Sequence, residues 1–408
     1  MNSLVSSPGE PISSWASPGV SPQASSKKKL KVLHIINTLG IGGAETVLCR
    51  LLTSSDRSAF DMQVIALVHD FPLGDRLREA GIRVHCLQMS KKSWSPASTA
   101  GLIRLLRSEK PDLVQTWLQH SDLLGGIAAK LAGVRFVLWN IRHSTLHPVL
   151  TSRRTRIVSR LCAFLSVLLP TRIVCCSESA RDEQSKLGYT PRKMLVIPNG
   201  IDVDRFKPDP EAYLGLRKQL GLAADVLLVG AAGRYHPAKD HAGLIRAAAE
   251  IAKARDDVHF VFCGDQVEME NEELRNRVLE TGFADRFHLL GQRDDVPGIL
   301  AALDVFVSSS GFSEGFPNVI CEAMASGVPC VATDVGDSAL IVGETGKVVP
   351  PGEPSALAQS VLELCAAGPD AVRNAGKRAR KRISEHFSLS RMVESYEQLY
   401  AETITQGR

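Results

Sequence analysis

The chain has 408 residues, of which 44% are hydrophobic and 23% charged, with a formal net charge of +4. This length predicts two or three ordinary globular domains, and so small a positive charge gives no indication of nucleic-acid binding. The nine cysteines contain no C-x-x-C and no zinc-type spacing, which fits a reducing compartment. All apolar runs fall short of the roughly 18–20 residues that span a bilayer. We therefore expect a cytoplasmic protein without a metal site.

The first 29 residues differ from the rest of the chain. They are rich in Ser, Pro and Gly and end in three lysines, at 27–29. They lack the apolar core of a secretory signal peptide. We expect residues 1–29 to form a disordered tail.

From Leu30 onward, short apolar strands alternate with helical patterns. Strands are expected at 31–36, 62–68, 83–87, 113–116, 136–139, 173–176 and 194–197, and helices at 44–52, 98–107 and 122–131. This alternation predicts an α/β domain with a doubly wound parallel sheet. The first turn, 37–43, contains three glycines before a helix. Such a turn suits a phosphate, and it equally suits a tight connection that lets the helix approach the strand.

Two loops at the expected ligand-binding edge of this sheet carry histidines. His120 follows the strand at 113–116, and Arg142 and His143 follow the strand at 136–139. Ligands of such sheets bind beyond the carboxyl ends of the strands. A histidine there would position or polarise an acceptor hydroxyl. The alternative is a loop histidine that bonds to neighbouring backbone.

Residues 151–170 combine four arginines with an apolar helical pattern. The arginines are Arg153, Arg154, Arg156 and Arg160. The pattern favours an ordinary helix packed on the sheet. The alternative is a helix that lies on an anionic membrane surface. Contact with lipid would indicate that the acceptor is lipid-linked.

A linker at 198–210, dense in Pro, Gly and Asp, separates this series from a second one. Its Asp202 and Asp204 form a D-x-D triplet, but no strand precedes them, so we interpret them as turn residues rather than metal ligands. Strands are then expected at 226–231, 258–263, 287–290, 304–307 and 331–332, a loop at 333–344, and helices at 242–254, 272–280, 355–367, 371–387 and 389–403.

The first strand of the second series leads into a turn with two cations, Arg234 and Lys239. Arginine offers a planar fork and lysine a point charge, so the pair suits a diphosphate. Further on, the backbone of the loop at 291–293, which contains Arg293, is placed to face a flat base.

The segment from Ser310 to Cys330 holds two glutamates, Glu314 and Glu322, eight positions apart. Pro317 is expected to be the first residue of a helix that Gly327 closes. At 1.5 Å per residue, Glu322 then lies roughly 7–8 Å further along the axis. The unpaired N–H groups of a helix start bind anions, so this geometry predicts a diphosphate at the helix mouth with one acid on each side. The alternative is a surface helix with two solvated glutamates.

Together these motifs resemble the retaining glycosyltransferases of family 4, of the polysaccharide and lipid-linked oligosaccharide type, which have the GT-B fold. The similarity extends from about residue 30 to about residue 400. The segments that carry it are Gly233-Arg234 with Lys239, Glu314-Gly315-Phe316-Pro317, Glu322-Ala323-Met324, Gly327-Val328-Pro329, Gly42-Gly43-Ala44-Glu45 and Asp334-Val335-Gly336-Asp337. The resemblance implies two Rossmann-like doubly wound parallel-sheet domains, 30–200 and 201–388, that face a cleft. A helix at 389–404 would return to the first domain.

The resemblance also implies a set of site residues. The donor would be bound by Gly42, Gly43, Arg234, Lys239, Arg293, Glu314, Gly315, Phe316, Pro317, Asn318, Val319 and Glu322. Among these, Arg234 and Lys239 would hold the diphosphate and Glu322 the ribose. Glu314 would lie beside the transferred sugar. His120 would act on the acceptor side, where Arg142 and His143 are further candidates.

The resemblance implies a retaining transfer of a sugar from a nucleotide donor, which we expect to be UDP-linked. Preorganised cations and N–H groups would stabilise the departing diphosphate, so no metal or other cofactor is implied. The expected partners are the nucleotide sugar and a glycan or lipid-linked acceptor, at the inner face of the cytoplasmic membrane. Double displacement and attack from the leaving-group face both remain open. The alternatives are a synthase of a small soluble glycoside, of the sucrose or trehalose type, and a non-catalytic nucleotide-sugar-binding module. A dehydrogenase is disfavoured because a clean G-x-G-x-x-G is missing.

Overall fold

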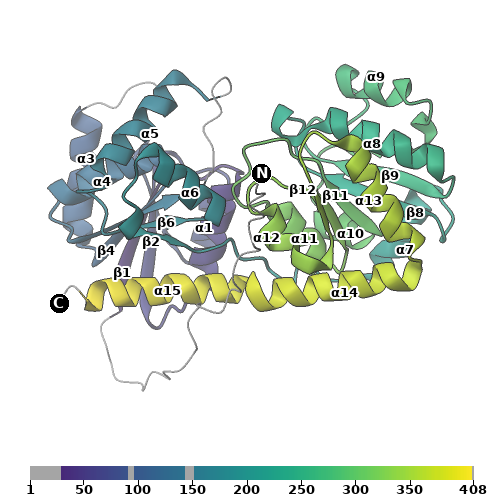
Figure 1. Cartoon of the computed structure of the whole chain (residues 1–408). Helices are drawn as coiled ribbons and strands as arrows, with labels where there is room; N and C mark the ends of the chain where they lie inside the picture. The colour runs from purple at the N-terminus through teal and green to yellow at the C-terminus, as the bar shows by residue number, and fades with distance from the viewer. Residues whose placement is uncertain (1–28, 91–95, 143–150, 407–408) are drawn as a thin grey trace, which may run out of the picture.

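In the computed structural model, which describes residues 29–90, 96–142 and 151–406, two α/β units lie side by side (Figure 1). The first contains a seven-stranded parallel sheet with the order β3-β2-β1-β4-β5-β6-β7. Its strands are β1 (Leu30–Thr38), β2 (Phe60–His69), β3 (Arg83–Cys86), β4 (Leu113–Trp117), β5 (Phe136–Ile141), β6 (Arg172–Cys175) and β7 (Met194–Val196). The strand order reverses between β1 and β4, so the sheet opens there at its carboxyl edge.

Helices connect these strands and cover both faces of the first sheet. They are α1 (Gly43–Ser54), α2 (Leu73–Glu79), α3 (Pro96–Glu109), α4 (Gln119–Leu131), α5 (Arg153–Leu165) and α6 (Glu178–Leu187). The central strands are buried on both faces, as their continuous apolar runs require. The first unit is therefore doubly wound, as the sequence predicts.

The second unit contains a six-stranded parallel sheet with the order β10-β9-β8-β11-β12-β13. Its strands are β8 (Leu227–Ala232), β9 (Val258–Cys263), β10 (Phe287–Leu289), β11 (Val305–Ser308), β12 (Cys330–Thr333) and β13 (Lys347–Val349). Its helices are α7 (Pro210–Gln219), α8 (His241–Ala254), α9 (Glu272–Glu280), α10 (Val296–Ala301), α11 (Asn318–Ala325), α12 (Ser338–Val342) and α13 (Pro354–Ala366). The order reverses between β8 and β11, which places the ligand-binding edge where the two cations and Glu314 follow these strands.

Two long helices at the end of the chain run beneath both units (Figure 1). Helix α14 (Pro369–His386) packs on α11 in the second unit, and α15 (Leu389–Thr405) packs on α1 in the first. On α15, Tyr396 and Tyr400 are completely buried. The Asn140 side chain of β5 donates a hydrogen bond to the Tyr396 hydroxyl over 2.9 Å. The last helix therefore returns to the first domain, as the resemblance implies.

The sequence-based elements differ from the structure in four places. The helix after Glu314 begins at Asn318, and Pro317 precedes it as the N-cap, because its ψ of 89° is not helical. His120 lies in the first turn of α4 rather than in a loop. The stretch 333–344, expected as a loop, contains α12, and the predictions omitted the helices α2, α6, α7 and α10 and the edge strand β13. Among the described residues, no helix is both long and apolar enough to cross a membrane.

Candidate active site

The mouth of α11 is built as the glutamate spacing predicts. Glu314 lies in the loop between β11 and α11, and Glu322 lies inside the helix. At the other end, the Gly327 N–H bonds to the Met324 carbonyl over 3.0 Å, and the Val328 N–H bonds to the Ala323 carbonyl over 3.1 Å. This Schellman cap needs the left-handed conformation that Gly327 adopts, with a φ of +81°. The helix is therefore fixed in length, with its amino end at the carboxyl edge of the sheet.

Lys239 and Glu314 meet at this edge. Lys239 Nζ lies 2.5 Å from Glu314 Oε1, and the Ser310 hydroxyl donates to the same oxygen over 2.9 Å. The Ser309 hydroxyl donates to the Lys239 carbonyl over 2.7 Å. A small cavity of about 20 Å³ lies here, with Gly233, Lys239, Ser310 and Val319 of α11 among its lining residues. The cationic turn and the start of α11 therefore face one cavity.

The turn that carries Arg234 and Lys239 is held close to the neighbouring strand. The Cβ of any larger residue at Gly264 would lie 2.2 Å from the Gly233 carbonyl oxygen, so glycine is required for this approach. Burial lowers the pKa of His236 in this turn, and the charges of Arg234 and Lys239 lower it further. Both cations therefore lie close enough to His236 to affect its charge.

Glu322 is paired across the interface between the two units. Its Oε1 lies 3.3 Å from Nη2 of Arg50 on α1, and the two side chains are only 15% and 16% exposed. Burial raises the pKa of Glu322, whereas the charge of Arg50 opposes that rise. Arg50 was not among the predicted site residues. No local pattern indicates it, because Arg50 and Glu322 are 272 positions apart along the chain.

Gly42 and Arg293 are further donor-side candidates. Gly42 precedes α1 as its N-cap in extended conformation. A Cβ on Gly43 would meet no atom within 4 Å, whereas one on Gly42 would lie 2.4 Å from a carboxylate oxygen of Glu45, so Glu45 partly covers the amino end of α1. The Arg293 side chain forms two bonds to Asp295, over 2.6 and 2.8 Å. Its guanidinium is therefore occupied by a neighbour, and only the backbone at Arg293 remains as the expected base contact.

His120 lines a larger cavity in the first unit. This cavity has a volume of about 170 Å³ and lies at the carboxyl edge of β1 and β2; its lining residues are Asn37, Leu67, Val68, Met89, Ser90, His120 and Leu124. Burial lowers the pKa of His120, and the charge of Arg154 adds to this. A neutral imidazole in a partly apolar cavity is suited to accept a proton or a hydrogen bond from a hydroxyl.

Arg142, another acceptor-side candidate, does not line this cavity. The Arg142 guanidinium lies over the Trp117 ring, 5.3 Å from its centre, and donates to the Tyr396 hydroxyl over 3.3 Å. It also bonds to Asn199, whose amide donates to the Asn318 side chain over 2.6 Å. Arg142 thus belongs to a chain of bonds that joins the two units. His143 lies outside the described residues.

The D-x-D triplet acts as turn chemistry. A side-chain oxygen of Asp202 accepts the N–H groups of Asp204 and Arg205 over 3.1 and 3.0 Å. Such a bond closes a local turn. The prediction for this triplet is confirmed.

Comparisons with known proteins agree with this architecture. Residues 41–205 match the family described as Glycosyltransferase Family 4, and residues 226–367 match Glycosyl transferases group 1. An α-1,3-galactosyltransferase of Escherichia coli, named as acting from UDP-Gal on GlcNAc-diphosphoundecaprenol, is 28% identical over 93% of this chain and 99% of its own. A lipopolysaccharide core mannosyltransferase of Rhizobium meliloti is 36% identical over 38% of this chain and 45% of its own.

A solved structure of HepE from Anabaena in complex with UDP superposes with a TM-score of 0.80 and 24% identity, over 91% of this chain and all of that one. Another, in complex with UDP-glucose, has a TM-score of 0.77 and 25% identity, over 92% of this chain and all of that one. The two family matches together cover most of the chain and follow its two sheets. The chain therefore belongs to the family 4 glycosyltransferases and has their GT-B fold.

Proposed function

We propose that this glycosyltransferase moves a hexose from a UDP-sugar to a polysaccharide or lipid-linked oligosaccharide, with retention of the anomeric configuration. The observation that carries this proposal is the pairing of Lys239 with Glu314 beside the amino end of α11, over a shared cavity. A cation and helix N–H groups stabilise a diphosphate, and a neighbouring carboxylate can contact the sugar attached to it. The UDP complexes of HepE and the lipid-linked substrate in the name of the E. coli relative support the same choice.

In this proposal the donor competes with Glu314 for Lys239. When the C1–O bond breaks, negative charge grows on the diphosphate, and Arg234, Lys239 and the N–H groups from Phe316 to Val319 stabilise it. These groups are preorganised, so little reorganisation is needed at the moment of reaction. The two cations supply the charge that a metal ion would otherwise provide, and we expect transfer to proceed in the presence of a chelator. Glu314 supports the sugar or attacks it, depending on which of the two retaining routes operates.

We propose that the cavity at His120 receives the sugar of the acceptor. Its lining combines the polar side chains of Asn37, Ser90 and His120 with four apolar ones, and a pyranose presents both hydroxyls and an apolar ring face. A volume of about 170 Å³ exceeds the 10–15 Å³ that one water requires by an order of magnitude. The His120 imidazole, which burial keeps largely neutral, would then contact the acceptor hydroxyl.

We propose that α5 places the enzyme on an anionic membrane. One face of α5 packs inward through Val158, Ser159, Cys162 and Ala163. On the other face Ile157, Leu161 and Phe164 are 58%, 46% and 76% exposed, and Leu168 just beyond the helix is 73% exposed. Arg153, Arg154 and Arg160 are also exposed. An apolar stripe bordered by arginines suits lipid headgroups and acyl chains, and Arg154 links it electrostatically to His120.

The donor assignment is tested by a panel of UDP- and GDP-sugars, with release of the nucleotide as the readout. We expect one UDP-sugar to be used, and Lys239→Ala to lower kcat/KM for it by about 10²–10³-fold, the usual effect of removing one such donor. Lys253→Ala, an exposed lysine of α8, serves as the control. Normal transfer by Lys239→Ala would refute the donor site. Lipid-linked and free sugars, supplied separately as acceptors, distinguish this function from a soluble glycoside synthase.

The membrane assignment is tested by co-sedimentation with vesicles. We expect binding to vesicles that contain phosphatidylglycerol and little binding to phosphatidylcholine alone, because the arginines attract anionic lipid. The double variant Phe164→Ser and Leu168→Ser should lose most of this binding. Leu279→Ser, which alters an apolar side chain of α9 that is 55% exposed, should not. Equal sedimentation of all three proteins would show that α5 is not the contact.

A further inference from the structure

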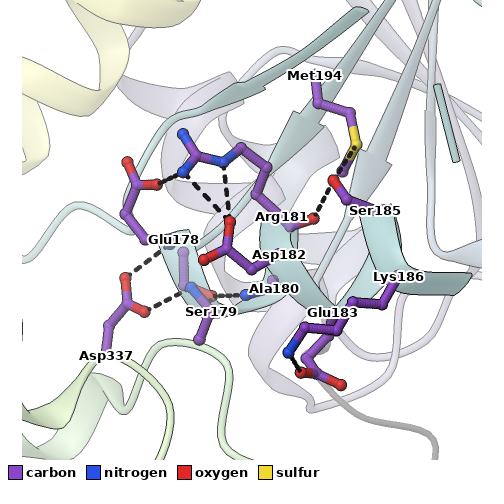
Figure 2. Close-up of polar contacts among 11 residues, drawn as sticks. Glu178, Ser179, Ala180, Arg181, Asp182, Glu183, Ser185, Lys186, Met194 and Asp337 are labelled. Atoms are coloured by element: carbon purple, nitrogen blue, oxygen red, sulfur yellow. Dashed lines mark hydrogen bonds and ion pairs between the residues drawn. The ribbon is translucent and has the colours of Figure 1, made fainter. Parts of the chain in front are cut away.

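A carboxylate of the second unit caps a helix of the first. Asp337 follows β12, and its two oxygens accept the backbone N–H groups of Glu178 and Ser179 over 2.8 and 2.9 Å. These are the first two residues of α6, and Figure 2 shows Asp337 reaching the start of that helix from the neighbouring unit. The Asp337 side chain is buried at this contact.

Helix α6 is capped in part by this carboxylate from the other unit. The first N–H groups of a helix have no partner within it. Of the N–H groups of the first turn, the Ser177 hydroxyl at the N-cap accepts that of Ala180, over 3.0 Å. Asp337 accepts the two N–H groups that precede that of Ala180, those of Glu178 and Ser179. A negative charge at a helix amino end is also favoured by the helix dipole, so the contact stabilises the two units only when they lie together.

The same residue is fixed to the donor loop. The Asp337 N–H bonds to the Gly315 carbonyl over 3.1 Å. Gly336 has a φ of +64°, and a Cβ there would lie 2.6 Å from the Glu314 carbonyl oxygen and 2.7 Å from that of Gly315. From the other unit, the Ser179 hydroxyl reaches the Gly315 carbonyl over 3.5 Å. Asp337 therefore connects the backbone beside Glu314 directly to the start of α6.

Charges around this contact are largely balanced. Glu178 and Asp182 lie nearby on α6, and both pair with Arg181, over 2.6 and 3.3 Å (Figure 2). Arg181 thus offsets the two acids of α6 that lie near Asp337. Separation of the units would take both N–H donors away from the Asp337 carboxylate, and the loss of these two charge-assisted hydrogen bonds is unfavourable.

We propose that Asp337 is a positioning residue that couples the approach of the two domains to the placement of Glu314. The inference rests on the proposed function, in which Glu314 lies beside the transferred sugar. When Asp337 caps α6, the backbone of Glu314 and Gly315 is held in place. When the domains separate, that constraint is released, so the donor sugar is correctly contacted only in the closed enzyme.

A matched pair of substitutions isolates the contact. Glu178→Pro removes one N–H that Asp337 accepts, and proline is well tolerated as the first residue of a helix. Ser177, with φ −159° and ψ 158°, already has the extended conformation that precedes proline. Glu178→Ala keeps the N–H and removes only the side chain. Asp337→Asn and Asp337→Ala test the other partner, and Asp334→Asn, an exposed acid of the same segment, is their control.

We expect Glu178→Pro and Asp337→Ala to lower kcat for sugar transfer by on the order of 10–100-fold, since small displacements of a catalytic group are costly. Asp337→Asn should have an intermediate effect because it retains one acceptor oxygen. Glu178→Ala and Asp334→Asn should stay within about twofold of the wild type. Combining Glu178→Pro with Asp337→Ala should add little to either change, as for two partners of one contact. UDP affinity should change little in all variants.

Two further readouts separate the possible failures. Small-angle scattering should give a larger radius of gyration for Glu178→Pro than for Glu178→Ala. If the wild type transfers sugar but these two variants are equally active and equally compact, the inference is wrong while the proposed function stands. A lower melting temperature without a kinetic change would also overturn the inference. If the wild type binds no UDP and transfers no sugar, the proposed function itself fails.

Discussion

At the scale of single residues, the site is a set of opposite charges that are paired before any donor arrives. Lys239 is bonded to Glu314, and Arg50 to Glu322. All four side chains are at most 26% exposed, so an unpaired charge would be costly. In the proposed function, the diphosphate of the donor would replace Glu314 as the partner of Lys239, and its ribose would replace Arg50 as the partner of Glu322.

The Arg50–Glu322 pair makes a prediction about pH. Burial raises the pKa of Glu322 and Arg50 counteracts it, so Arg50→Gln should raise that pKa further. A carboxylate whose pKa is raised is ionised only at higher pH, and the ionised form accepts the ribose hydroxyls. We expect UDP affinity, measured by calorimetry from mildly alkaline to mildly acidic pH, to decrease as the pH is lowered. In Arg50→Gln this decrease should begin at a higher pH than in the wild type.

The control for this experiment is Arg57→Gln, which changes an exposed arginine just beyond α1. Its pH profile should match that of the wild type. A parallel loss of affinity at all pH values in Arg50→Gln would mean that Arg50 acts through packing and not through the charge of Glu322.

At the scale of secondary structure elements, the site depends on where each helix begins and ends. Helix α11 has only eight residues, so a shift of its end would move both Glu322 and the N–H groups at its mouth. The cap at Gly327 prevents this shift. In the same way, α6 contributes to the contact between the units through its amino end, whereas α1 contributes Arg50 from its middle.

Gly327→Ala tests the importance of this cap. The alanine would keep a positive φ and place its Cβ 2.9 Å from Cγ of Pro208. We expect a loss of about 1–3 kcal/mol in the free energy of unfolding, from backbone strain and crowding together. Denaturant unfolding measures it.

Gly352→Ala is a matched control, because Gly352 has a similar φ of +79° but a Cβ there would meet no atom within 4 Å. Gly352→Ala should show the effect of backbone strain alone, so its loss in the free energy of unfolding should be smaller. Equal losses would mean that the contact with Pro208 is irrelevant to stability.

At the scale of the whole molecule, the two domains are joined by more than the linker. Ile201 forms a parallel bridge with Ser388, so the chain crosses between the domains twice at one place. Around this crossing lie the contacts of Arg50, Asn199 and Asp337 with the opposite domain. A covalent crossing at one place suits a hinge, and closure about it would assemble the donor site that we propose.

Tyr396→Ala tests how far the last helix stabilises the first domain. Tyr396 is completely buried, its ring lies 6.2 Å from that of Trp117, and it receives the Asn140 hydrogen bond. We expect a loss of about 3–5 kcal/mol, as for other large aromatic truncations, detected by tryptophan fluorescence during unfolding. Glu394→Ala, an exposed change on the same helix, should have almost no effect. An unchanged first-domain transition in Tyr396→Ala would show that α15 is dispensable.

Particular residues show how much could be predicted from the sequence. The glutamate spacing, the closing Gly327 and the two cations beside the first strand of the second domain are local patterns, and the structure brings Lys239, Glu314 and α11 together as expected. By contrast, α6 is a polar ten-residue helix with a weak apolar pattern, so periodicity missed it. Arg142 was expected near the acceptor, but its guanidinium bonds to Asn199 and Tyr396, which no local pattern indicates.

The sequence by itself determined two series of alternating strands and helices and the chemistry at the ends of their main strands, because hydrophobic period, helix caps and glycine turns act over a few residues. Only the tertiary structure decided which residues of one domain meet the other. Arg50 with Glu322 and Asp337 with the start of α6 are separated by more than 150 positions. Their contacts follow from how two complete domains dock, and docking depends on surfaces that exist only after each sheet has folded.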